Sequence, residues 1–204
     1  MKKLNVNAAV LDLRQLSEET LDAYESCTLA TVVALTNRRA QNLLARKGVR
    51  LDTALTINSE EELEVNVING KVTLDGNGIP EKKQVLVVNG KLFLKPEAAA
   101  VLDNYESIVV NGKIYCPASM SSRVLARCLV NGKACVYPDD AVVLNGTVKL
   151  DRSFLLRAQP RLYWAERVFV AADPKLDAAA LAATGAHFAG PKAILTESNA
   201  AVLA

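Results

Sequence analysis

The sequence predicts an α/β repeat fold, a solenoid in which each unit of about 20 to 22 residues contributes a short strand and a short helix. Five segments carry Asn-Gly between apolar residues, and in four of them a Lys follows. They are VINGKVTL (67–74), VVNGKLFL (87–94), VVNGKIYC (109–116), LVNGKACV (129–136) and VLNGTVKL (143–150). Their glycines, Gly70, Gly90, Gly112, Gly132 and Gly146, are separated by 20, 22, 20 and 14 residues. A recurring spacing of this size is typical of stacked repeats.

Residues 1–64 are predicted to be diverged N-terminal units of the same array. At an offset of 81 residues, eight identities align this region with the clear repeats, including Tyr24 with Tyr105 and Arg46 with Arg127. Ser17 precedes two glutamates, which is typical of the start of a helix. A second helix is expected around residues 38–47, where the basic residues would form a solvated face.

Residues 65–150 contain the clear repeats. Each apolar run around Asn-Gly predicts extended chain. The residues that follow two of these runs, Pro96-Glu97 before AAAVLDNYE and Pro117 before SMSSRVLARC, predict short helices. Stacked units would pair their strands in parallel and cover one side with helices. An alternative is an α+β array in which each Asn-Gly closes a two-residue hairpin. In either fold these glycines serve as structural turns, because the corner needs a positive φ or a close backbone approach.

Residues 151–204 are predicted to form longer units and to complete a single repeat domain of residues 1–204. Strands are expected at 166–172 and 191–197, and an Ala-rich helix at 173–183. The last residues resemble the helix start at 97–103, so the chain stops inside a unit and leaves an open apolar end. A homo-oligomer formed through such open ends is therefore a possible assembly.

The array resembles the leucine-rich repeats in its unit length, in its strand plus helix, and in an Asn that follows an apolar strand. The family's spacing of leucines is not met, since VVNGKIYCP has Val109-Val110-Asn111 where Leu-x-Leu-x-x-Asn would stand. The resemblance therefore implies a similar architecture and carries over no functional residue.

Composition excludes several classes of protein. The 24 basic and 22 acidic residues leave a formal charge of +2, which predicts no nucleic-acid binding. No run of about 18 apolar residues predicts a membrane span. The residues after Met1 are too polar for a secretion signal, so a cytoplasmic protein is expected. The cysteines show no redox or zinc spacing, which indicates reduced thiols.

No motif predicts catalysis. The single histidine, His187, lies among apolar and loop residues, where a turn or packing role is expected. No metal site, cofactor or phosphate-binding loop is predicted. A carbohydrate-active solenoid enzyme remains the catalytic alternative, with Asp139-Asp140 and Asp151-Arg152 as the only close charged groups near the repeats.

One positional feature predicts binding. The four lysines that follow Asn-Gly would form a like-charged row able to attract an anionic partner, or else would be solvated corner residues. They are Lys71, Lys91, Lys113 and Lys133. The sequence thus predicts a non-catalytic protein-interaction or scaffolding module whose protein partner is unknown. A self-assembling structural protein is a further alternative.

Overall fold

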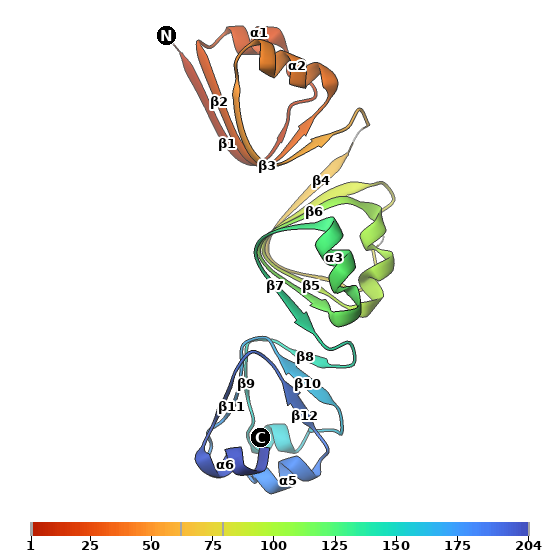
Figure 1. The fold of residues 1–204 in the computed structure, drawn as a ribbon, viewed down its shortest axis with the longest axis vertical. Coiled ribbons are helices and arrows are strands. Elements are labelled where there is room, and N and C mark those ends of the chain that lie inside the picture. The colour runs from red at the N-terminus through yellow and green to blue at the C-terminus, as the bar shows by residue number, and fades with distance from the viewer. Residues whose placement is uncertain (1, 62, 79, 204) are drawn as a thin grey trace.

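The computed structural model describes residues 2–61, 63–78 and 80–203. Met1 and Ala204, the ends of the predicted domain, lie outside these described residues. The molecule is elongated, and its lobes follow one another in chain order along the long axis, as Figure 1 shows. We name them the N-terminal lobe (residues 3–58), the central lobe (64–137) and the C-terminal lobe (142–203).

The N-terminal lobe is a three-stranded parallel sheet in the order β1-β2-β3, with two helices on its concave side. Its elements are β1 (Lys3–Asp12), α1 (Glu18–Asp22), β2 (Ser26–Thr36), α2 (Arg38–Arg46) and β3 (Arg50–Asn58). The predicted helix start is confirmed, because the Ser17 hydroxyl accepts a hydrogen bond from the Thr20 N–H at 3.2 Å. Asn37 caps α2 in the same way, accepting from the Ala40 N–H at 2.8 Å.

The central lobe contains a four-stranded parallel sheet in the order β4-β5-β6-β7. Its strands are β4 (Glu64–Leu74), β5 (Gln84–Leu94), β6 (Tyr105–Pro117) and β7 (Cys128–Tyr137). The Asn-Gly-Lys segments pair in register, so that Gly70, Gly90, Gly112 and Gly132 form one column across the sheet. Each strand bends at its glycine and continues, which gives the lobe its V-shaped outline (Figure 1).

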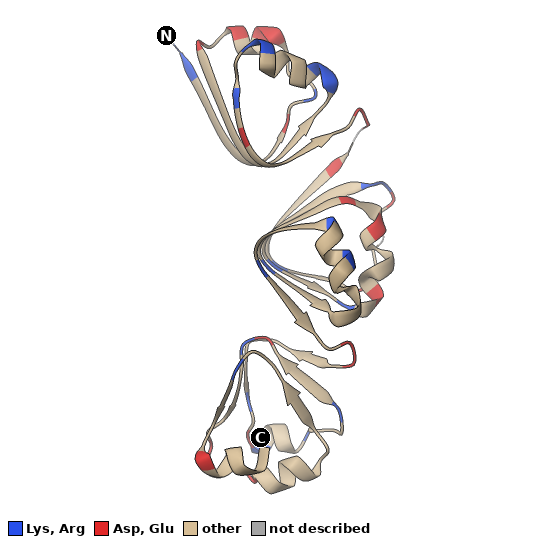
Figure 2. Ribbon diagram, viewed as in Figure 1, with Lys and Arg blue, Asp and Glu red and all other residues tan. Residues whose placement is uncertain are grey.

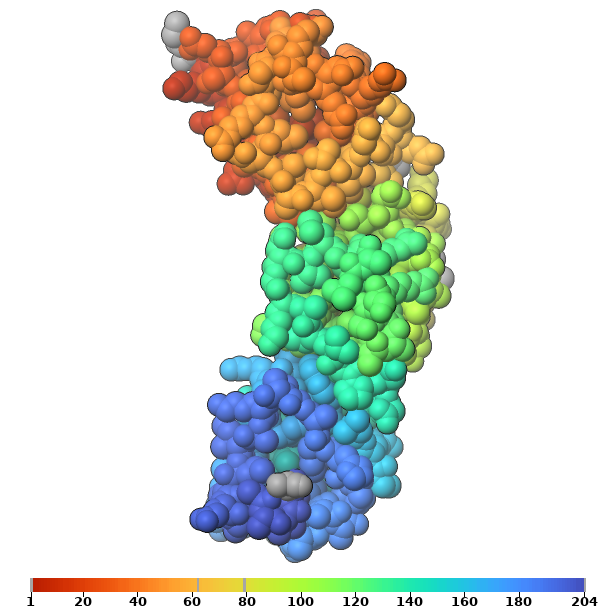
Figure 3. All heavy atoms as spheres, viewed as in Figure 1, coloured from red at the N-terminus to blue at the C-terminus, as the bar shows by residue number. Residues whose placement is uncertain are grey.

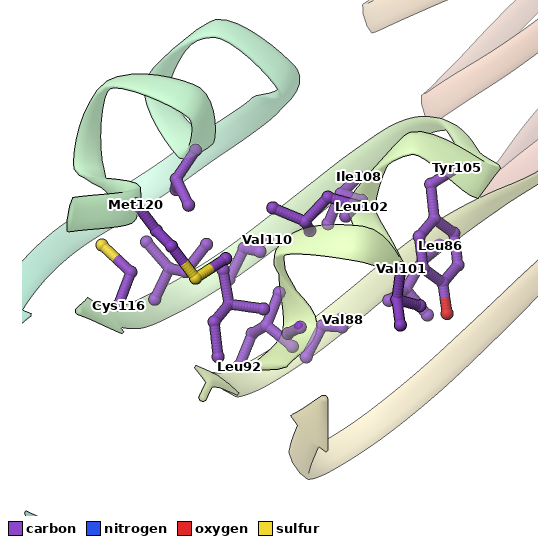
Figure 4. Close-up of a cluster of buried hydrophobic side chains, with 14 residues drawn as sticks. Leu86, Val88, Leu92, Val101, Leu102, Tyr105, Ile108, Val110, Cys116 and Met120 are labelled. Atoms are coloured by element: carbon purple, nitrogen blue, oxygen red, sulfur yellow. The ribbon is translucent and has the colours of Figure 1, made fainter. Parts of the chain in front are cut away.

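Short helices close the open side of the central V. They are η1 (Pro96–Ala100), η2 (Leu102–Asn104), η3 (Ala118–Met120) and α3 (Ser121–Arg127). The helix predicted after Lys95 is therefore two 3-10 turns, whereas the one predicted after Pro117 contains a true α-helix. Figure 4 shows side chains from the strands, including Leu92 and Val110, meeting Leu102 and Met120 from the helical turns. These residues make the central hydrophobic core.

The C-terminal lobe has two three-stranded parallel sheets, because its strands are interrupted at the bend. The sheet orders are β12-β10-β8 and β13-β11-β9. The strands are β8 (Val142–Leu144), β9 (Thr147–Lys149), β10 (Leu162–Ala165), β11 (Val168–Ala171), β12 (His187–Ala189) and β13 (Ala193–Leu195). The helices are α4 (Arg152–Leu155), α5 (Ala178–Ala183) and α6 (Glu197–Leu203).

Hydrophobic clusters join the lobes. Val33 and Leu35 of β2 pack with Val85 and Val87 of β5 between the N-terminal and central lobes. Aromatic side chains fill the second joint, between the central and C-terminal lobes; they are Phe93, Tyr115, Tyr137 and Trp164. The inner strands of the central sheet, β5 and β6, are consequently buried on both faces, by helices on one and by neighbouring lobes on the other.

The solenoid prediction is wrong. The structure has four separate small parallel sheets, and the register of Asn-Gly-Lys segments is confined to one of them. Gly146, predicted as the fifth turn, lies between β8 and β9 and outside that column. The hairpin alternative is also wrong, because each of the four Asn-Gly-Lys segments lies inside one continuous strand that pairs in parallel. The strands on either side of Gly146, β8 and β9, belong to different sheets. A glycine at φ between +112° and +153° bends an extended strand instead of reversing it.

Among residues 2–61, 63–78 and 80–203, no helix combines the length and the apolar character needed to cross a membrane. All four cysteines are free thiols, with Cys27 and Cys116 buried and the other two half-buried.

Candidate functional site

The structure places the four predicted lysines in one column, one residue after the glycine column. Two of them are held by neighbouring groups. The Lys71 ammonium donates to Oδ1 of Asn145 at 2.8 Å and lies 4.5 Å from the centre of the Phe93 ring. The Lys91 ammonium forms an ion pair with the carboxylate of Glu166. The row is therefore not a free ladder of charges. Among the residues that the structure describes, only Lys113 and Lys133 are exposed without such a contact.

Glu166 lies in the turn between β10 and β11, and its side chain is 4% exposed. It accepts hydrogen bonds from Lys91, from the Tyr115 hydroxyl at 2.9 Å and from the Gly146 N–H at 3.1 Å. Burial alone would raise the pKa of this carboxyl, but the hydrogen bonds outweigh burial and the pKa is lowered. Burial, followed by the hydrogen bond to Glu166, raises the pKa of Tyr115. Glu166 is thus an ionised carboxylate that fixes the central lobe to the C-terminal lobe.

A cleft of about 640 Å³ opens beside Glu166, between the central and C-terminal lobes. We call it the basic cleft. Its walls come from β6, β7, the β10–β11 turn and the β12–β13 turn. Its lining residues are Lys113, Tyr115, Lys133, Cys135, Val136, Trp164, Glu166, Arg167, Val168, Gly190, Pro191, Lys192 and Ile194. Figure 2 shows Lys and Arg positions both on the bend of the central strands and on the adjoining part of the C-terminal lobe.

The charge of the basic cleft is strongly one-sided. Its cations are Lys113, Lys133, Arg167 and Lys192. Within the described part of the chain, none of these four side chains forms an ion pair. The single carboxylate of the described lining, Glu166, is already neutralised by Lys91. The cleft therefore carries an uncompensated positive charge that an anionic ligand would stabilise.

The basic cleft also has an apolar part. Trp164 lies edge-on to Tyr115, with 5.9 Å between ring centres. Val136 and Ile194 line the cleft with 49% and 42% of their surface exposed. A ligand that combined carboxylates with apolar side chains would match both parts of this surface.

Two of the four cations that line the basic cleft belong to the lysine row that the sequence predicts. Lys113 and Lys133 belong to the predicted row, but Arg167, Lys192 and Trp164 come from turns and a strand outside the Asn-Gly-Lys pattern. No spacing in the sequence links those residues to the row. Elsewhere in the described residues, no group of three or more His, Cys, Asp or Glu side chains could hold a metal ion. His187 lies exposed at the start of β12.

Comparisons with protein-family models, with curated proteins and with solved structures found no match for this chain.

Proposed function

We propose that this protein is a non-catalytic interaction module that binds an acidic segment of a partner protein in the basic cleft. One observation carries the proposal: the four unpaired cations converge on a cleft whose only described carboxylate is already in an ion pair. The formal charge of the whole chain is only +2, so the attraction is local to the cleft.

The shape and chemistry of the cleft favour a short peptide segment. A volume of about 640 Å³ is within the ordinary range for ligand pockets and accommodates a few residues. Carboxylates of the segment would contact Lys113, Lys133 and Arg167, while an apolar side chain would pack near Trp164. Nucleic acids favour an extended basic surface, whereas these cations occupy one recess.

The same geometry does not favour the carbohydrate-active alternative. Glycoside hydrolysis ordinarily uses two carboxyl groups that face each other across the scissile bond. Along the described lining of the basic cleft there is one carboxylate, and its oxygens are occupied by Lys91, Tyr115 and Gly146. We also propose a cytoplasmic location, which the free thiols support because such compartments keep cysteines reduced.

The test uses Trp164, the only tryptophan of the chain, as a reporter inside the cleft. A fluorescein-labelled peptide of alternating Glu and Leu is titrated with the protein, and both anisotropy and tryptophan emission are followed. We expect saturable binding that weakens steeply with salt and a shift of the Trp164 emission. The double variant Lys113→Glu with Lys133→Glu should weaken binding by about tenfold or more, because it removes two attractive charges and adds two repulsive ones.

The matched control is Lys82→Glu with Lys175→Glu. Both lysines are exposed and lie outside the cleft, so this variant has the same net charge as the cleft variant. It should bind the peptide almost as well as the natural protein does. Equal losses in the two double variants, or binding without a change in Trp164 emission, would contradict the proposal.

A further inference from the structure

The central sheet ends in two long strands that, among the described residues, have no neighbouring strand on one side. Because the sheet order is β4-β5-β6-β7, the 11-residue β4 and the 10-residue β7 each present an open edge. Proteins usually shorten, bulge or cover such edges, since unpaired N–H and C=O groups recruit another strand. In Figure 3 the green surface of the middle lobe contains the β7 region, while β4 lies on the far side of the sheet in Figure 1.

The side chains at the two edges are chemically complementary. Asn89 donates to Asn69, Asn111 to Asn89 and Asn131 to Asn111, at 2.8, 2.8 and 2.9 Å. The ladder runs in one direction, so it ends in a free donor and a free acceptor. Within the described residues, the side-chain N–H group of Asn69 donates to nothing and the side-chain oxygen of Asn131 accepts from nothing. The β4 edge therefore offers the donor, and the β7 edge offers the acceptor.

Apolar columns are also cut off at the edges. Val87 and Val109 are fully buried, yet Val67 at the β4 edge of the same column is 39% exposed. In a second column Leu92 and Ile114 are fully buried, whereas Ala134 at the β7 edge is exposed. A strand paired to either edge would bury these positions as the inner strands already bury theirs.

The glycine column shows the same interruption. A Cβ added to Gly90 or Gly112 would lie 2.1 Å from the carbonyl oxygen of the glycine on the preceding strand. At Gly132 the corresponding distance is 1.9 Å. A Cβ added to Gly70 would have no atom within 4 Å among the described residues. The β4 edge therefore has the shape that receives another Asn-Gly strand.

We propose that the β7 edge of one copy of this chain pairs in parallel with the β4 edge of a second copy. Val130-Asn131-Gly132-Lys133 of one copy would lie opposite Ile68-Asn69-Gly70-Lys71 of the next, in the register that the sheet uses internally. The Asn131 side-chain oxygen accepts from Asn69 of the neighbouring copy and closes the ladder. Because the two edges differ and lie on opposite sides, this contact repeats and builds an open filament.

The numbers of strands indicate which sheet makes the contact. The central sheet has four strands and the flanking sheets have three, so one translation cannot make all of them continuous. A spacing of about 19 Å, four strands at about 4.8 Å each, continues the central sheet and leaves the flanking sheets apart. The lysine column would also continue, and its repulsion is reduced by salt. Assembly should therefore strengthen with salt, the opposite of what we expect for the basic cleft.

The experiment measures sedimentation velocity over a hundredfold range of concentration, with electron microscopy of the heaviest fractions. We expect the average mass to rise with concentration and with salt, and filaments with an axial repeat of about 19 Å. Asn69→Asp keeps the acceptor for Asn89 but replaces the free donor with a carboxylate at the β4 edge. Ala134→Lys puts a charge beside the β7 edge. Each variant alone should be monomeric at the concentrations at which the natural chain assembles.

A mixture of the two variants gives the decisive measurement. Each retains one intact edge, so an equimolar mixture should form a dimer and nothing larger. Asn42→Asp, an exposed position on α2, has the same charge change as Asn69→Asp and should assemble like the natural chain. Circular dichroism establishes that every variant is folded. A natural chain that stays monomeric throughout, an assembly that neither edge variant reduces, or a mixture that forms no dimer would each overturn the proposal.

Discussion

Glu166 connects residues that are distant in the sequence. Its carboxylate accepts from Lys91 in β5, from Tyr115 in β6 and from the Gly146 N–H before β9. A buried charge is stable only when it is paired and hydrogen-bonded. For Glu166, Lys91 supplies the opposite charge, and Tyr115 and Gly146 supply further hydrogen bonds. Removing the charge should therefore weaken the joint between the central and C-terminal lobes.

We predict that Glu166→Gln lowers the free energy of unfolding at pH 7 by about 2 kcal/mol, because one charged acceptor of three hydrogen bonds becomes a neutral one. The pKa of Glu166 is lowered in the fold from its ordinary value of 4.5. Its stabilisation is thus complete above that value and is lost as the pH falls through the lower folded pKa. Urea unfolding at pH 7 and at successively lower pH should show the difference between the two proteins shrinking below about pH 4.5.

Glu19→Gln provides the control for this measurement, because Glu19 is exposed in α1. Its effect should stay within about 0.5 kcal/mol at every pH. A difference between natural protein and Glu166→Gln that is constant down to the lowest pH would show that the charge of Glu166 contributes nothing.

The basic cleft illustrates how far residue-level prediction reaches. Identical positions in successive Asn-Gly-Lys segments were enough to predict that Lys113 and Lys133 lie side by side. The sequence contains no comparable sign for Arg167 or Lys192, which follow short strands in turns of unequal length. Those two residues reach the cleft only because the aromatic joint around Trp164 places the C-terminal lobe against β6 and β7.

At the scale of elements, the glycine column makes the bent strands possible. Gly112 has a φ of +145°, and a Cβ there would lie 2.1 Å from the Gly90 carbonyl oxygen. Gly70 has a φ of +112° but open space around its Cβ position. A side chain at Gly70 would therefore meet backbone strain alone, whereas one at Gly112 would meet both backbone strain and a steric clash.

We predict that Gly112→Ala destabilises the protein by about 3 kcal/mol or more, because strain and a backbone clash act together. Gly70→Ala should cost about 1–2 kcal/mol, since only the positive φ opposes the new side chain. Urea unfolding at low protein concentration measures both, without any contribution from assembly. Equal costs at the two positions would show that the inner strands separate easily enough to admit a Cβ.

The strands also show why the fold was only partly predictable. Parallel pairing in register followed from the repeated Asn-Gly-Lys segments. The division into separate sheets did not, although one sign was present: VLVV in β5 is apolar without alternation and buried throughout. Such a run indicates a strand covered on both faces. In a solenoid with helices on one side, the other face of the strand would be polar. The apolar VLVV run does not fit that pattern, and it indicates that a second layer packs against the other face.

At the scale of the whole molecule, the lobes are joined by hydrophobic contacts at both junctions. Valine and leucine side chains fill the N-terminal joint, and aromatic side chains fill the C-terminal joint. Joints of this kind couple the stability of neighbouring units, so we expect the lobes to unfold together in one step.

We predict that thermal unfolding of the natural chain follows one transition, with the same midpoint by far-ultraviolet circular dichroism and by Trp164 fluorescence. Val33→Ala tests whether the two joints are coupled. Val33 is fully buried in the N-terminal joint, whereas the reporter Trp164 lies in the C-terminal joint. The substitution should cost about 2 kcal/mol and lower both midpoints together by about 4–8 °C. If circular dichroism becomes biphasic while the fluorescence midpoint stays unchanged, the N-terminal lobe unfolds as a separate domain. A common shift instead means that the joints transmit the loss across the central sheet.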